Sequence, residues 1–406
     1  MATVKLNTKE FASMLSKVSK CTVKGGVSII SELVEIRLAS GVLSLRTTDT
    51  RNIMILRKNG VAGDDFVATI PLEIFEKIVS KTSKEEVTLE VDDKAVHLTG
   101  NGTYHFALTI EGDTPVTFEP LKMLEDPEVK IQFKKADFLE ALKYTGDFVC
   151  SQYVDPTLSG FYFGEHVITT DLCNCAYLHK KFFDNDIMFY PPTLALINEI
   201  DDEQVMFLKK GRKIQFISST CLIDSIMHSD TENFPVEEFN GYLKDDFGSC
   251  VTISKSEATQ ILDRVSFFVD MKSEFGATLL DFKPEGVAIS DKGGKAAELL
   301  SIKEPVNFSE YTCYVGAQDM IKALSFEGED DIKLWYANPT ALRIESGNIT
   351  RILALLDPND LEGAINFEAA DAATEAAVDF GADIPESDAA PVEPTTMESA
   401  MDTIQW

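Results

Sequence analysis

Apolar and polar residues follow a pattern along this chain that recurs three times. In the first copy, two apolar runs flank a Thr-Asp turn, GVLSLRTTDTRNIMIL at 41–56, which predicts a β-hairpin. Similar hairpins are predicted for EHVITTDLCNCAYL at 165–178 and EGVAISDKGGKAAELL at 285–300. The aspartates of the three turns are Asp49, Asp171 and Asp291. They are 122 and 120 residues apart, which indicates one domain plan used three times.

Two helices are predicted in each copy. A strand leads into a helix at 4–18, 129–145 and 251–265. A second helix follows each hairpin, at 70–81, 190–200 and 315–326. Short strands close the copies, as at 87–110 and 332–356. Single amphipathic helices flanked by several strands favour an α+β fold, with antiparallel sheets and helices on one face. The period of about 120 residues is far longer than that of a solenoid repeat.

These patterns divide the 406 residues into four segments. Three repeated domains are expected at 1–123, 128–246 and 249–358, followed by a tail at 362–406. The tail is rich in Ala, has eleven acidic residues and no Lys or Arg, and is predicted to be disordered. Its closing MDTIQW has apolar residues on a polar tether, which is typical of a peptide that seeks a groove, although an inert tail is the alternative.

Composition argues against several classes of protein. No apolar run is long enough to cross a bilayer and the N-terminus lacks a signal sequence, so a cytoplasmic protein without a membrane partner is expected. The five histidines form no catalytic or metal-binding motif, and Cys173-x-Cys175 has no second ligand pair at zinc spacing. The segment SDKGGKAAE lacks the P-loop pattern. The sequence therefore predicts neither an enzyme nor a need for a cofactor or metal.

The threefold plan resembles the bacterial-type sliding clamp, the β subunit of the replicative DNA polymerase, of which a viral version is an alternative. LSLRTTDTRNIMI is similar to the first-domain motif of that family, and VITTDLCNCAYL to its second-domain segment. NFPVEEF at 233–239 matches a further family block. The resemblance covers residues 1–356. It implies three clamp domains with sheets outside and helices inside, and a ring of two subunits joined head to tail. That ring would encircle duplex DNA without reading its sequence and tether the DNA polymerase, with a clamp loader as a further partner.

A channel for DNA requires local basic charge, because the net charge is −30 and remains −19 without the tail. Helical wheels place lysines opposite the apolar face of the first helix (Lys9, Lys17 and Lys20) and of the sixth (Lys322). In the second helix Lys77, Lys81 and Lys84 fall within one arc beside the apolar face. The resemblance adds Lys24 and Gln152 in loops that contact DNA in the family. Solvated lysine faces are the plain alternative for any single helix.

The resemblance also implies a pocket for partner peptides and a joint between subunits. The pocket positions are Leu158, Thr170, Leu172, Cys173, Asn174, Cys175, Pro235, Phe239, Ile352, Leu353 and Leu355. Leu-Cys-Asn at 172–174 replaces the usual Gly-His-Arg, so a different peptide motif is expected. At the joint, Phe106 and Leu108 are expected to meet Phe267 and Phe268 of a second copy. The competing hypothesis is a clamp-fold scaffold that recruits transcription or repair proteins without encircling DNA.

Overall fold

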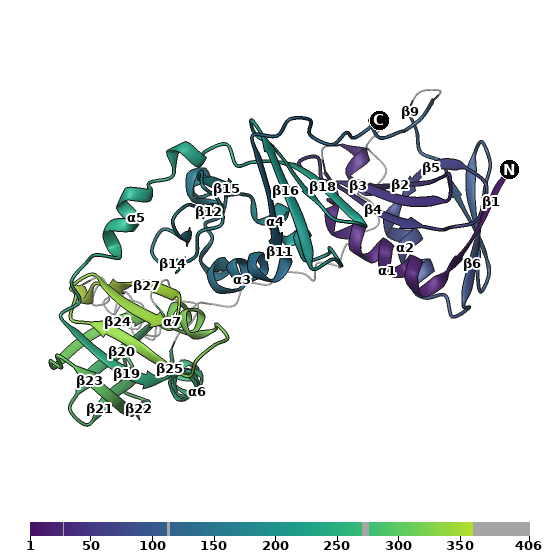
Figure 1. Cartoon of the computed structure of the whole chain (residues 1–406). Coiled ribbons are helices and arrows are strands. Elements are labelled where there is room, and N and C mark those ends of the chain that lie inside the picture. Colours follow the sequence, from purple (N-terminus) through teal and green to yellow (C-terminus); the bar gives the residue numbers. More distant parts are fainter. Residues whose placement is uncertain (27, 112–113, 270–275, 360–406) are drawn as a thin grey trace, which may run out of the picture. The chain divides into compact units, whose positions relative to one another are not determined.

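The computed structural model describes residues 1–26, 28–111, 114–269 and 276–359 (Figure 1). The chain divides into two compact units, Met1–Leu356 and Asp357–Trp406, and all elements below belong to the first. The predicted tail at 362–406, with Met401, Ile404 and Trp406, lies outside the described residues. The helices are α1 (Thr8–Val18), α2 (Leu72–Ser80), α3 (Lys135–Thr145), α4 (Pro191–Ile197), α5 (Val236–Tyr242), α6 (Lys255–Val265) and α7 (Ala317–Leu324).

Short antiparallel strands make up most of the remaining structure. The first repeat has β1 (Ala2–Asn7), β2 (Leu33–Ala39), β3 (Val42–Thr48), β4 (Ile53–Asn59), β5 (Phe66–Pro71), β6 (Glu86–Val91), β7 (Ala95–Thr99), β8 (Thr103–Ala107), β9 (Ile110–Glu111) and β10 (Thr114–Pro115). The second has β11 (Val129–Lys134), β12 (Phe161–Phe163), β13 (Val167–Thr170), β14 (Cys175–Leu178), β15 (Ile187–Phe189), β16 (Gln204–Lys210), β17 (Lys213–Ile217) and β18 (Cys221–Ile226). The third has β19 (Ser249–Ser254), β20 (Ala277–Lys283), β21 (Gly286–Asp291), β22 (Ala297–Leu300), β23 (Ile302–Val306), β24 (Tyr311–Gly316), β25 (Asp331–Tyr336), β26 (Ala341–Ser346) and β27 (Ile349–Leu356).

Six of the seven helices in the described residues form three pairs, one in each repeat, and α5 stands outside these pairs. The first helix of each pair, α1, α3 or α6, is 11 residues long and directly follows a strand. The second helix, α2, α4 or α7, packs against the first. In the first repeat, which Figure 1 shows with α1 and α2 side by side, Phe11 and Phe75 meet edge to face with ring centroids 5.9 Å apart. The predicted α+β class, with antiparallel sheets and amphipathic helices, is confirmed.

The three hairpin turns share one hydrogen-bonding device. The Asp49 carboxylate accepts bonds from the backbone N–H of Arg51 and Asn52, at 2.9 and 2.6 Å. Asp171 accepts in the same way from the second and third residues after it, at 3.2 and 2.8 Å. Asp291 accepts from Gly293 at 2.8 Å and closes a turn that is two residues longer. An aspartate that binds its own following backbone stabilises a tight turn, which explains why the same residue recurs at each position.

Two sheets run from one repeat into the next. Strand β4 of the first repeat pairs antiparallel with β18 of the second, and β14 of the second pairs antiparallel with β27 of the third. We call these the first and second junctions. They join the repeats into an eight-stranded and a thirteen-stranded sheet. Since the sheets cross the predicted limits at 1–123, 128–246 and 249–358, and Met1–Leu356 forms one unit, these domain boundaries stay a prediction.

The described residues contain no helix that is long and apolar enough to cross a membrane.

Candidate functional site

A pocket of about 320 Å³ opens beside the second junction. It is lined by Leu158, Thr170, Leu172, Cys173, Asn174, Cys175, Pro235, Glu238, Phe239, Tyr242, Asp245, Thr340, Ala341, Ile352 and Ala354. Nine of the eleven residues predicted for a partner pocket are therefore brought together. The segments that carry them are far apart in sequence and meet because β14 pairs with β27.

The hairpin turn at Asp171 forms one wall of the pocket. The backbone of Leu172 has φ +88°, in the left-handed region that leucine rarely adopts. Its N–H donates to the Thr170 hydroxyl at 3.1 Å, and the adjacent bonds to Asp171 hold the turn. The first repeat has the same feature, because Thr50, also directly after the aspartate, has φ +78°. This geometry leaves the Leu172 side chain 52 % exposed at the pocket, as an apolar contact for a ligand.

Aromatic residues form a separate hydrophobic cluster beneath the pocket. Phe239 of α5 stacks on Phe234 with ring centroids 5.2 Å apart, and Phe234 stacks on Tyr162 at 4.5 Å. The hydroxyl of Tyr177 donates to the Phe239 carbonyl at 2.9 Å, which ties α5 to β14. Burial raises the pKa of the neighbouring Cys175 thiol to about 12, so the floor of the pocket is apolar and uncharged.

Two predicted pocket residues, Leu353 and Leu355, do not line it. Side chains alternate along β27, so Ile352 and Ala354 face the pocket while Leu353 and Leu355 point to the other side of the strand. Leu353 is fully buried in the main core and Leu355 packs against it. The lining residues that sequence reasoning missed are Glu238, Tyr242, Asp245, Thr340, Ala341 and Ala354. Helical spacing from Phe239 could have indicated Tyr242, three residues later.

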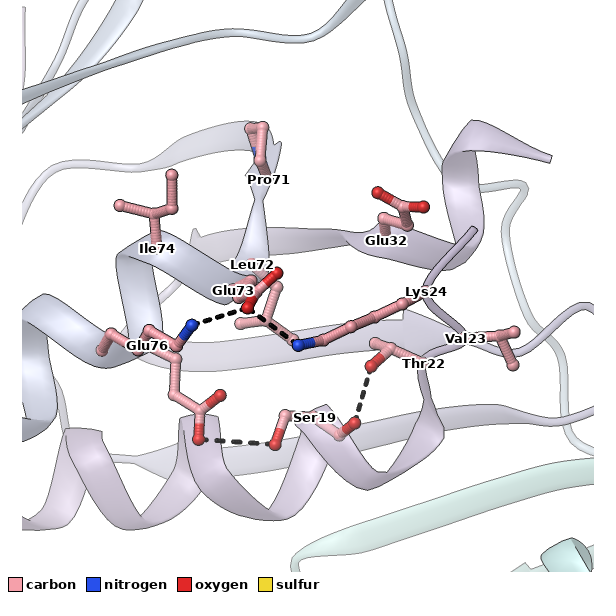
Figure 2. Close-up of a pocket in the computed structure, with 11 residues that line it drawn as sticks. Ser19, Thr22, Val23, Lys24, Glu32, Pro71, Leu72, Glu73, Ile74 and Glu76 are labelled. Atoms are coloured by element: carbon pink, nitrogen blue, oxygen red, sulfur yellow. Dashed lines mark hydrogen bonds and ion pairs between the residues drawn. The ribbon is translucent and has the colours of Figure 1, made fainter. Parts of the chain in front are cut away.

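The lysines predicted to face DNA are mostly exposed, but three are in ion pairs. Lys9, Lys20, Lys81, Lys84 and Lys322 are exposed, as is Gln152. The Lys24 and Lys77 ammonium groups both contact the Glu73 carboxylate, at 2.8 and 2.6 Å. Figure 2 shows the pair between Lys24 and Glu73 in a pocket of about 360 Å³. Hydrogen bonds from the two lysines lower the pKa of Glu73 to about 2, and the bond from Lys24 has the larger effect.

Lys17 is less exposed than Lys9 and Lys20, the other lysines of its helix wheel. It is half-buried and pairs with Asp201, so its charge is largely offset. With Lys9 it lines an open pocket of about 520 Å³ that also contains Arg57 and Lys58 of β4. Sequence reasoning missed these two basic residues, because they lie on a strand rather than a helix face.

The loop after α3 presents a further missed residue. Gln152 is exposed as predicted, and the adjacent Tyr153 is 100 % exposed, with Val154 exposed beside it. A fully exposed aromatic side chain is suited to contact a ligand. The aromatic directly after Gln152 was the signal in the sequence that could have identified it.

The four residues predicted to form a joint between subunits differ in exposure. Phe267 and Phe268 are 84 % and 53 % exposed. Phe106 is half-buried and meets Phe75 edge to face at 5.0 Å, while Leu108 is only 9 % exposed within its own chain. Leu108 therefore supports the fold of the first repeat, and the two phenylalanines after α6 are the apolar surface that remains available. Among the described residues, no group of three or more His, Cys, Asp or Glu side chains is arranged to hold a metal ion.

Comparison with known proteins identifies the fold. No family model matches the sequence, and no curated protein sequence does either. Solved structures match over most of the chain. The DNA polymerase III β chain from Streptococcus pneumoniae aligns with a TM-score of 0.77 and 13 % identity, over 88 % of this chain and 100 % of that one. The DNA polymerase III β subunit from Thermotoga maritima gives 0.76 and 12 %, with the same coverage. The DNA polymerase sliding clamp from Bacillus subtilis gives 0.76 and 15 %, over 88 % of this chain and 99 % of that one. The chain thus has the fold of the bacterial DNA polymerase III β sliding clamps.

Proposed function

We propose that this chain is a sliding clamp. Two copies join head to tail into a ring around duplex DNA and tether a DNA polymerase for processive synthesis, after a clamp loader has opened the ring. The clamp acts on DNA in the cytoplasm as an accessory factor without turnover, and it needs no cofactor. One observation carries the proposal, namely the way in which successive repeats are joined.

The two junctions follow one rule. The strand directly after the hairpin turn of one repeat, β4 or β14, pairs with the last long strand of the next repeat, β18 or β27. Within the described residues two strands lack this kind of partner: β22 pairs only with β21, and β8 pairs only with β7. They are the strand after the third turn and the last long strand of the first repeat. Pairing β22 of one copy with β8 of another therefore extends the rule and supports closure into a ring.

Exposed lysines on α1, α2 and α7, together with Lys20 just after α1 and Lys81 and Lys84 just after α2, support DNA inside the ring. Each phosphate that a protein neutralises adds salt-dependent affinity, so a clamp that slides needs few and loose contacts. The acidic body and the ion pairs of Lys17, Lys24 and Lys77 reduce the net attraction, which fits retention by topology rather than by tight binding. The pocket beside the second junction supplies the docking site for peptides of the polymerase and the loader.

A retention assay tests the proposal. The mass of the protein in solution should be that of two chains, and protein loaded on nicked circular DNA should stay bound through gel filtration until the DNA is linearised. Replacing Lys9, Lys20, Lys77 and Lys81 with Glu should slow loading and weaken retention, most clearly at lower salt, because added salt screens the contacts between lysines and phosphates. A monomer, or equal retention on circular and linear DNA, would favour the scaffold that recruits proteins without encircling DNA.

A further inference from the structure

The charged residues that line the peptide pocket are both acidic. Glu238 and Asp245 line it directly, and no Lys or Arg is found among its described lining residues. Asp171 forms the adjoining turn, and Asp319 of α7 lies close enough to that turn to interact with it. The pocket thus combines an apolar floor with acidic walls from two repeats.

The titratable groups of the pocket respond to this negative charge. Burial first, and then Asp171 and Asp319, raise the pKa of the Cys173 thiol. Tyr242 donates its hydroxyl proton to a hydrogen bond with Glu238, at 2.7 Å, and this bond raises the pKa of Tyr242 to about 12. Groups on both sides of the pocket are therefore held in their protonated forms, partly by neighbouring carboxylates.

The basic residues near the pocket are Lys244, directly before Asp245, Arg343 and Lys322, and none of them is among its described lining residues. Arg343 donates to the Leu243 carbonyl at 3.2 Å and pairs with Glu345 at 3.1 Å. Its guanidinium also lies over the rings of Phe247 and Trp335, and across the sheet Arg343 pairs with the lining residue Ile352. Lys322 is exposed and offsets Asp319 in part. A ligand that covers the acidic walls must therefore bring its own positive charge, because a desolvated carboxylate without a partner is costly.

We propose that the pocket selects peptides in which a Lys or Arg lies next to the apolar anchors. This inference rests on the proposed function, in which the pocket docks partner peptides, and it specifies the chemistry of those partners. Apolar anchors fill the floor above Phe239 and Cys175, while the basic side chain meets Glu238 and Asp245. The chain's own 362–406 segment has apolar residues at MDTIQW but no Lys or Arg, so it is disfavoured as the occupant.

Selection from a random peptide library tests this preference without a known partner. The full chain is the target, and bound peptides are kept only if they protect Cys173 from a maleimide reagent. Cys173 is an exposed pocket residue, whereas the other six cysteines are buried, so its modification reports occupancy. We expect the protecting peptides to share apolar residues and at least one base. Changing that base to Glu should weaken binding by about tenfold or more, and added salt should reduce the difference.

Charge variants of the protein provide the matched control. Glu238→Gln with Asp245→Asn should weaken the basic peptides about 3- to 10-fold, since exposed pairs contribute modestly. Glu238→Lys with Asp245→Lys should shift the selected peptides toward Asp and Glu. Glu237→Lys changes charge on the same helix but outside the lining, and it should leave affinity within about twofold.

Three results would contradict the proposed preference for basic peptides, each for a different reason. Protecting peptides that are neutral or acidic would overturn the charge preference and leave the docking pocket in place. If no peptide protects Cys173 while the protein still forms rings on DNA, the pocket is not a docking site and this inference fails with it. If Cys173 is protected in the free protein and released by deletion of 362–406, the chain's own acidic segment is the occupant, which also contradicts the inference.

Discussion

The two junctions between repeats have the same backbone and different interiors. Each is an antiparallel ladder of four residue pairs that begins four residues after the turn aspartate. In the first junction the residue five after Asp49, Met54, pairs with Ile223. In the second, the residue five after Asp171, Ala176, pairs with Arg351. One position of a repeated joint is thus an apolar side chain in one case and a guanidinium in the other.

The first junction is joined by neutral hydrogen bonds. The side-chain oxygen of Asn52, which is completely buried, accepts bonds from the hydroxyls of Thr193 and Ser225 in the next repeat, at 2.7 and 2.6 Å. Its amide nitrogen donates to Asp49 at 2.7 Å, so the turn itself carries the contact. Asn174 has the same place after Asp171, but its oxygen accepts from the backbone N–H of Ala354 at 3.2 Å.

The second junction is joined by a buried charge. Arg351 is 0 % exposed, and its guanidinium donates to the carbonyls of Tyr144, at 2.8 Å, and Lys322. It also pairs with Asp147 at 3.2 Å. One side chain of β27 thereby holds the end of α3 and the end of α7 together. A neutral network tolerates the loss of one member better than a buried ionic one, in which the partners are left without compensation. The comparison predicts that the second junction is the more sensitive to substitution.

The largest effect is expected at the third joint, which requires a second copy. Phe267→Asp with Phe268→Asp should convert the dimer into monomers, because each buried aromatic contributes about 1.5–3 kcal/mol. The loss corresponds to a dissociation constant higher by about 10² to 10⁴. Light scattering over a dilution series measures it. Ile29→Asp, a comparable change of an exposed apolar residue elsewhere, is the control and should leave the dimer intact. An unchanged dimer in the Phe267/Phe268 variant would refute this assignment of the joint.

Arg351→Ala should produce the next largest effect, a loss of about 2–4 kcal/mol in the free energy of unfolding. The variant leaves Asp147 and two carbonyls without their donor and creates a cavity. Urea denaturation followed by circular dichroism measures the change. Arg351→Met retains much of the volume and should cost less, which separates the ionic part from the packing part. Equal stability of Arg351→Ala and the parent would contradict the role of this residue at the second junction.

The pattern of apolar residues predicted the repeats well, because hairpins and amphipathic helices are local features. The six helices of the three pairs lie within the ranges that a 3.6-residue period indicates. Strands flank each turn aspartate, as the apolar runs on both sides of it indicate. The pairing of β4 with β18 and of β14 with β27 could not be read from such patterns, since it joins segments more than 150 residues apart. Arg351 occurs in the apolar run ITRILALL and gave no sign that it is buried between two repeats.

The pocket was predicted in part for the same reason. Nine residues followed from the family resemblance, whereas Leu353 and Leu355 were assigned to the wrong side of β27. That strand is buried on both faces for most of its length, so its sequence has no alternation that could fix the register. Glu238 was missed because NFPVEEF was matched as a block, without reading the helical face that α5 presents, and Asp245 follows α5, outside that block.

Substitution of the two turn asparagines, Asn52 and Asn174, should change the free energy of unfolding by smaller amounts that differ between the two junctions. Asn52→Ala removes the acceptor of two buried hydroxyls and should lower the free energy of unfolding by about 1–3 kcal/mol. Asn174→Ala removes one backbone acceptor at the edge of the peptide pocket and should cost about 1 kcal/mol. Parallel urea titrations of the two variants provide the test. A larger loss for Asn174→Ala than for Asn52→Ala would show that the neutral network is not what holds the first junction.

The smallest expected effect is a dependence of stability on pH through His228. Its side chain is only 1 % exposed and lies 3.2 Å from the Ser159 hydroxyl, with its ring against that of Tyr190. The Arg51 guanidinium of the first repeat lies over the same Tyr190 ring, at 3.7 Å. Burial lowers the pKa of His228, and the positive charge of Arg51 acts in the same direction against the attraction of Asp230.

Below pH 6.5 the unfolded chain therefore binds a proton at His228 more readily than the folded chain does. The unfolded state then holds more protons, so stability rises with pH across this window and is lost as the pH falls below the ordinary histidine value. Thermal unfolding at pH 7.5 and 5.5 should show the lower midpoint at pH 5.5. His228→Gln should reduce this difference. The pKa of His179 at the second junction is lowered too, by burial and by His166, but its side chain is exposed, so His179→Gln should matter less. If His179→Gln reduced the difference more than His228→Gln, the pH response would belong to the second junction instead.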